Sequence, residues 1–112
     1  MGDETDKSRI DQLLEFLQED PDDHFSLYAL ALEYKSGGRV EEAVAALEQL
    51  RGRAPTYVPT YYQLAMCLMD LGRERDALDA AVAGIPLARA AGNLKTVTEL
   101  EALAAQIRDA SA

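Results

Sequence analysis

The sequence repeats itself with a period of 34 residues. Shifting positions 27–46 by that distance matches seven identical pairs: Tyr28 with Tyr62, Leu30 with Leu64, Ala31 with Ala65, Gly38 with Gly72, Arg39 with Arg73, Ala43 with Ala77 and Ala46 with Ala80. The opposite shift matches Val44 with Ile10, Leu47 with Leu13 and Pro55 with Pro21. A fixed period in the range of about 20 to 50 residues is typical of repeat architectures. The chain is therefore predicted to stack similar units, with half a unit at its N-terminal end.

Each unit reads as two short helices joined by a glycine turn. Apolar residues recur at spacings of three and four along the whole chain, which is the helical period. This pattern predicts six helices and no strands, at about residues 8–19, 22–36, 40–51, 57–71, 74–91 and 94–109. Pro21 is suited to the first turn of the second helix, where its missing N–H costs little. Gly37 or Gly38 is expected to end that helix in the left-handed conformation. Gly84 and Pro86 interrupt the pattern of the fifth helix, and Pro86 predicts a kink there. Asn93 is suited to cap the sixth helix.

The repeated positions resemble the signature of the tetratricopeptide repeat family. In the first full unit the signature positions hold Leu30, Ala31, Tyr34, Gly38, Ala43, Leu47 and Pro55; in the second they hold Leu64, Ala65, Leu68, Gly72, Ala77 and Ala81. The sequence departs from the family at the tryptophan position, which holds Leu27 and Tyr61, and at the second closing proline, where Arg89 stands. The resemblance implies an all-α fold, a short α-solenoid of antiparallel helix pairs with terminal capping helices.

The same pattern divides the chain. Residues 1–7 are expected to be a disordered N-terminus, and residues 8–112 a single repeat domain. Within it we assign 8–20 to an N-terminal cap or half repeat, 22–55 to the first repeat and 56–92 to a second repeat with a kinked second helix. Residues 93–110 are assigned to a C-terminal capping helix, because stacked repeats need polar outer faces at their ends.

The resemblance also implies a binding surface, since in this family the first helix of each pair lines a concave face that holds partners. The corresponding residues are Phe25, Tyr28, Leu32 and Lys35 in the first unit, and Tyr62, Met66 and Met69 in the second. Tyrosine and methionine suit interfaces, because tyrosine adds a hydroxyl to its apolar ring and methionine adapts its shape. Two alternatives stay open for this surface: the sixth helix could cover it as core, or a second copy of the chain could pack on it as a homodimer.

Charge and composition narrow the function classes. The net charge is −9, and residues 1–23 carry nine acids against two bases. Nucleic-acid binding, which needs clustered Lys and Arg, is not expected. Nor is binding of acidic chaperone tails, which some family members grip with basic clamps, because Tyr28, Leu32, Tyr62 and Met66 stand at those positions. No apolar segment reaches the length of a membrane helix or a secretory signal, so a cytoplasmic protein is expected.

No catalytic, metal or cofactor site is predicted. His24 is the only histidine and Cys67 the only cysteine, and they read as a surface residue and a core residue. Asp20, Asp22 and Asp23 lack the spacing and glycine of a calcium loop. The expected function is a non-enzymatic scaffold or adaptor that binds a peptide, helix or partner protein. The alternatives are an oligomerisation or structural unit, and a small chaperone that shields an apolar client segment.

Overall fold

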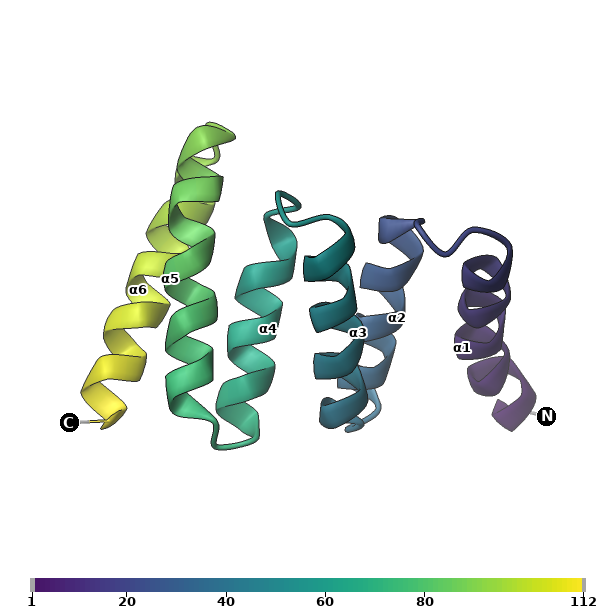
Figure 1. Cartoon of the computed structure of the whole chain (residues 1–112). Helices are drawn as coiled ribbons and strands as arrows, with labels where there is room; N and C mark the ends of the chain where they lie inside the picture. The colour runs from purple at the N-terminus through teal and green to yellow at the C-terminus, as the bar shows by residue number, and fades with distance from the viewer. Residues whose placement is uncertain (1, 112) are drawn as a thin grey trace. The chain divides into compact units, whose positions relative to one another are not determined.

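The structure, a computed structural model, describes residues 2–111, and the side chains of residues 9–110. Over that range the chain is all α-helical, as predicted, and has no strand. Six helices follow one another with short turns: α1 (Gly2–Glu19), α2 (His24–Ser36), α3 (Val40–Arg53), α4 (Pro59–Asp70), α5 (Glu74–Ala90) and α6 (Leu94–Ser111), coloured along the chain in Figure 1. None of these helices is both long and apolar enough to cross a bilayer.

The helices form two compact units, residues 1–54 with α1 to α3 and residues 55–112 with α4 to α6. The division falls between Ala54 and Pro55, where the sequence pattern ends the first full repeat. The finer division into repeats and caps, and the single domain over 8–112, stay predictions.

A glycine in the left-handed region ends a helix at three places, at Gly38, Gly72 and Gly92, with φ of 78°, 73° and 72°. At the first, Gly38 N–H donates to the Lys35 carbonyl and Arg39 N–H to the Tyr34 carbonyl, at 3.1 and 2.8 Å. These two bonds make a Schellman motif, which satisfies carbonyls left open at a helix end. The prediction for Gly38 is confirmed, and the same bonds recur 34 residues later at Gly72.

In unit 1 (residues 1–54), α2 and α3 form a tight antiparallel pair (Figure 1). The pair buries Leu27, Leu30 and Ala31 of α2 against a face of α3 that holds Ala43, Ala46, Leu47 and Leu50. The small side chains let the two backbones approach, and the leucines fill the space between them. Helix α1 also packs on α2, with Leu13 buried and Arg9 paired with Glu33 at 3.2 Å.

Two predictions at the N-terminal end differ from the structure. Helix α1 begins at Gly2 rather than Ser8. That residues 1–7 are disordered stays a prediction. Acidic residues favour the positive end of a helix, and residues 2–6 contain three of them. Pro21 was expected in the first turn of the second helix, but it lies in the turn before it, and Asp23 caps α2. A proline fills the expected role in α4 instead, at Pro59.

In unit 2 (residues 55–112), α5 packs between α4 and α6, and Gly84 lies where the three meet. A Cβ atom on Gly84 would come 2.7 Å from Cβ of Tyr61 in α4 and 2.9 Å from Cδ1 of Leu100 in α6. Both distances are far below ordinary contact, so glycine is what allows this close packing. Helix α5 is assigned without a break through Pro86. The kink predicted there stays a prediction.

Candidate partner-binding surfaces

Helix α2 carries four of the predicted binding residues, which we call the α2 strip: Phe25, Tyr28, Leu32 and Lys35. Phe25 is 66% exposed, an uncommon exposure for a large apolar side chain, and its ring lies 4.3 Å from the ring of His24. Tyr28, Leu32 and Lys35 are half-buried. With 3.6 residues per turn these four positions lie on one side of α2, away from the buried face that holds Leu27 and Leu30. The α2 strip is thus an apolar surface that solvent reaches in part.

Helix α4 carries the other three predicted residues, the α4 strip: Tyr62, Met66 and Met69. All three are half-buried, while Leu64, Ala65 and Leu68 on the neighbouring side of the helix are buried. Within unit 2, α6 packs chiefly along α5 rather than along α4. Two methionines and a tyrosine therefore remain partly accessible on α4.

A third surface, which the sequence reasoning missed, is a pocket of about 490 Å³ in unit 1. We call it the α1–α3 pocket. Its lining comes from all three helices of the unit: Leu14, Leu17, Gln18 and Pro21 from α1 and the following turn, Leu27, Leu30 and Tyr34 from α2, and Glu42, Ala45, Ala46 and Gln49 from α3. Helical geometry places Leu27, Leu30 and Tyr34 on the side of α2 opposite to the α2 strip.

The sequence contained one sign of this pocket. Helix α1 corresponds to the second helix of a repeat whose first helix is missing from the pattern, yet Leu14 and Leu17 make it apolar on more than one side. Leu14 is 40% exposed in the structure. An apolar helix without its usual partner is a place to expect a surface that is not fully covered.

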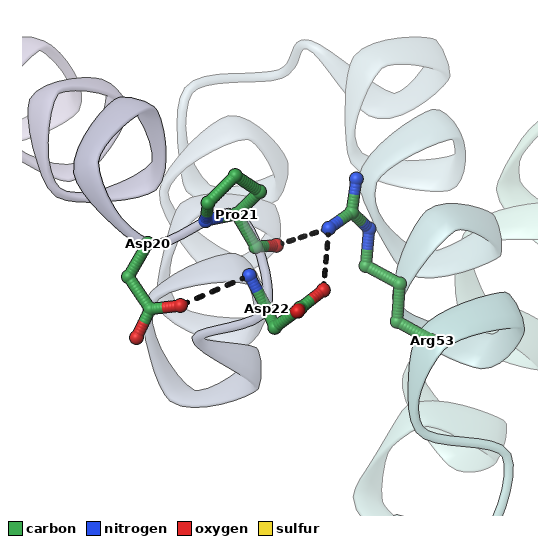
Figure 2. A network of polar contacts seen from close by, with 4 residues as sticks. All are labelled: Asp20, Pro21, Asp22 and Arg53. Carbon is green, nitrogen blue, oxygen red and sulfur yellow. Dashed lines mark hydrogen bonds and ion pairs between the residues drawn. The ribbon is translucent and has the colours of Figure 1, made fainter.

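The aspartates between α1 and α2 have separate structural roles, which Figure 2 shows in part. The Asp20 carboxylate accepts a hydrogen bond from the Asp22 N–H at 3.2 Å. Arg53, in the last turn of α3, donates to the Pro21 carbonyl at 2.5 Å and to the Asp22 carboxylate at 2.9 Å. The guanidinium thereby ties the α1–α2 turn to the end of α3.

Asp23 caps α2. Its carboxylate accepts bonds from the Ser26 hydroxyl at 2.6 Å and the Ser26 N–H at 3.3 Å. These bonds, the hydroxyl's first, hold the pKa of Asp23 below its ordinary value because they favour the charged form. At the start of α3, the hydrogen bonds between Arg39 and Glu42 raise the pKa of the guanidinium and lower the pKa of the carboxyl.

The residues described offer no metal site, since they contain no group of three His, Cys, Asp or Glu side chains placed to share an ion. Cys67 is buried in α4, as the sequence predicted. His24 is half-buried in the first turn of α2 beside Phe25.

Comparison with known proteins gives the family. A family model described as anaphase-promoting complex, cyclosome, subunit 3 matches residues 9–83, more than half of the chain. The solution structure of a tetratricopeptide repeat domain protein from Salinibacter ruber is 38% identical, with a TM-score of 0.74, over 79% of this chain and 89% of that chain. The chain belongs to the tetratricopeptide repeat family. No match was found among the curated proteins.

Two more distant structures share the tetratricopeptide repeat fold. PcrH, solved in complex with the chaperone binding region of PopD, has a TM-score of 0.86 at 15% identity, over 98% of this chain and 86% of that one. The TPR2B domain of yeast Sti1, solved with pHsp70, has a TM-score of 0.83 at 17% identity, over 89% of this chain and 80% of that one. At these identities the likeness establishes the fold alone.

Proposed function

We propose that this protein is a non-enzymatic interaction module that binds a peptide or helix of a partner protein through apolar surfaces on its helices, the α2 strip in unit 1 and the α4 strip in unit 2, each a surface of its own unit. The observation that carries the proposal is the exposure of Phe25 at the start of an otherwise half-buried apolar strip. Phe25 continues into Tyr28 and Leu32, and a contiguous apolar surface of this kind, unlike a single exposed side chain, is a candidate for contact with another molecule. Membership of a repeat family whose solved relatives include peptide complexes supports it.

The strip chemistry favours an apolar ligand. Lys35 is the one charged residue among the seven strip residues, and the others are aromatic, aliphatic or thioether side chains. Such surfaces bind amphipathic helices or extended segments through a few apolar anchors. A ligand held through its carboxylates does not fit, because a single lysine would have to neutralise them.

A small chaperone that shields an apolar segment of a client is the second candidate. Met66 and Met69 favour it, because flexible methionine side chains can repack around more than one sequence. The two candidates differ in specificity: an adaptor selects one partner, whereas a chaperone of this kind prevents aggregation of its client.

The test is the double substitution Tyr28→Ala with Met66→Ala, one on each strip. Both side chains are half-buried, so the variant is expected to keep its helical circular dichroism while losing partner capture from a lysate of the source organism. The control is Val82→Ala, which removes an exposed apolar side chain from α5. Unfolding of the double variant would show that the strips are core, and unchanged capture would show that they are not the interface.

A self-association role, the remaining alternative, is tested by light scattering. A monomer at high protein concentration is expected under the proposal. A dimer that the strip substitutions dissociate would replace the partner protein with a second copy of this chain.

A further inference from the structure

The α1–α3 pocket is separate from the strips on which the proposed function rests. Leu14 and Leu17 line it from α1, Leu27 and Leu30 form part of its surface on α2, and Ala45 lines it from α3. Its volume of about 490 Å³ falls within the range of ligand pockets, roughly 300–1,000 Å³. Its lining residues on α1 and on α3 recur at spacings of three and four, so each helix presents one side to the pocket.

Acidic residues flank this apolar lining. By helical position, Asp11 and Glu15 lie beside Leu14 and Gln18 on α1, and all four are exposed. On α3, Glu41 and Glu48 lie next to Ala45 and are exposed. Glu42, which lines the pocket, has its charge matched by Arg39 at 2.5 Å. Four carboxylates therefore lie at the border of the pocket, those of Asp11, Glu15, Glu41 and Glu48. Within the described residues, none of the four forms an ion pair.

One described base of unit 1, Arg39, lies at the pocket, where it pairs with Glu42 and stands over the ring of Tyr34 at 4.8 Å. Other bases of the unit are engaged by other groups. Arg9 pairs with Glu33 at 3.2 Å, and Arg53 pairs with Asp22 at 2.9 Å. Lys35 belongs to the α2 strip on the other side of the helix. Unit 1 as a whole carries thirteen acids and six bases, against seven and five in unit 2. The acidic excess of the protein is thus concentrated in the unit that contains the pocket.

We propose that the α1–α3 pocket binds a basic amphipathic helix of a partner protein. Its apolar anchors, spaced by three or four residues, would occupy the space between Leu14, Leu30 and Ala45. Lys or Arg residues on its two flanks would face the carboxylates of Asp11 and Glu15 on one wall and of Glu41 and Glu48 on the other. Such complementarity speeds association and selects against acidic competitors.

The same charges argue against other occupants. A second copy of this chain carries a net charge of −9 and would bring like charges to an acidic border. A small apolar molecule would fill the lining but leave the four carboxylates without a role. The basic helix is the occupant that uses both features.

The experiment uses the full-length protein and a labelled, designed helical peptide of about 15 to 20 residues, long enough to be partly helical alone. The peptide carries Leu at positions i, i+3 and i+7 and Lys on both flanks; a matched peptide carries Glu in place of each Lys. Fluorescence anisotropy measures binding at low and high salt. The basic peptide is expected to bind at least about tenfold more tightly than the acidic one, and more weakly as salt rises.

The site is tested by a matched pair of substitutions. Ala45→Arg places a bulky cation in the pocket at an exposed helical position, and Ala102→Arg makes the same change at an exposed position of α6. Both change the net charge equally and leave core side chains in place. Ala45→Arg is expected to weaken binding of the basic peptide by about tenfold or more. Ala102→Arg is expected to weaken it by less than about twofold.

Two results would overturn the proposal. One is equal binding of the basic and acidic peptides; the other is equal weakening by Ala45→Arg and Ala102→Arg, which would indicate attraction to the protein's overall charge. Tyr28→Ala separates this proposal from the proposed function. It is expected to leave binding of the peptide unchanged even when capture at the strips is lost, and a loss of peptide binding would place the peptide on the α2 strip.

Discussion

Phe16 in α1 and Gly84 in α5 stand two repeat periods apart, at the position that Leu50 occupies in α3. Their surroundings differ. Phe16 is 54% exposed, whereas Leu50 is fully buried, and Gly84 is so closely packed that a single added carbon would collide with Tyr61 and Leu100. The packing of the two helices differs: α5 has a helix on each side within unit 2, whereas the described part of α1 packs chiefly on α2.

The difference shows how one repeat position takes its properties from what lies beside it. Where two helices enclose the position, it must be small or complementary in shape. In α1, which packs chiefly on α2, a large apolar residue stays accessible, and the neighbouring lining opens into the α1–α3 pocket.

The largest expected effect is the difference in stability loss between alanine substitutions at Leu50 and at Phe16. Leu50→Ala should destabilise the protein by about 2–5 kcal/mol, because it leaves a cavity in the packing of α3. Phe16→Ala, at the same repeat position, should change stability by less than about 0.5 kcal/mol, as exposed substitutions usually do. Urea unfolding followed by circular dichroism measures both. Equal losses would mean that α1 is enclosed in solution, and the comparison would fail.

Gly84 provides the next test, at the enclosed position. Gly84→Ala should destabilise by about 1–3 kcal/mol, because Tyr61 or Leu100 must move to admit the methyl group. The matched control is Gly52→Ala in α3, where no atom lies within 4 Å of the added carbon. There alanine should stabilise by about 0.5–1 kcal/mol through its better helix propensity. A change in unfolding free energy of the same sign at both positions would contradict the close packing around Gly84.

The smallest effect concerns the caps, which differ between the units. Asp23 caps α2 with a carboxylate, and Asn93 caps α6 with a neutral amide that accepts from Thr96 N–H at 3.2 Å. The pKa of Asp23 is lower in the folded state than in the unfolded state, so its carboxylate stabilises the fold at pH values above the unfolded pKa. This stabilisation is lost as the pH falls through the folded pKa. At pH values below about 4, the unfolding midpoint should therefore decrease more steeply with falling pH in the wild type than in Asp23→Asn.

A titration of Asp23 by nuclear magnetic resonance gives the pKa directly. Ser26→Ala removes the hydroxyl that contributes most to the shift, so the pKa of Asp23 should rise toward its ordinary value. An unchanged pKa would show that the hydroxyl bond is not formed in solution.

Much of the fold follows from local signals. The 34-residue period, the three glycines at helix ends and the cap at Asn93 are short-range patterns, so the helices and their order could be predicted. The predicted start of α1 was wrong, because where a helix ends in a polar segment depends on neighbours that the pattern does not include. The predicted place of Pro21 was wrong for a similar reason: Pro59, not Pro21, lies in the first turn of a helix.

The candidate surfaces were less predictable. The strips were placed by resemblance, and their role in binding stays a prediction. The α1–α3 pocket could not be found from the period alone, because it depends on how far α1 stands from α3 and on how little space Ala45 and Ala46 fill. The close approach at Gly84 was also missed: glycine inside a helix was read as an interruption, when it is a contact point between three helices.

The most direct test is to replace Tyr28 by a photo-reactive phenylalanine analogue in cells of the source organism. The cells are then illuminated, and the cross-linked products are identified by mass spectrometry. The account predicts a cross-link to a segment of a different protein, lost when an apolar anchor of that segment is changed to a charged residue. A cross-link only to α6 or to a second copy of this chain would contradict it, and so would the absence of any product from a residue that solvent reaches.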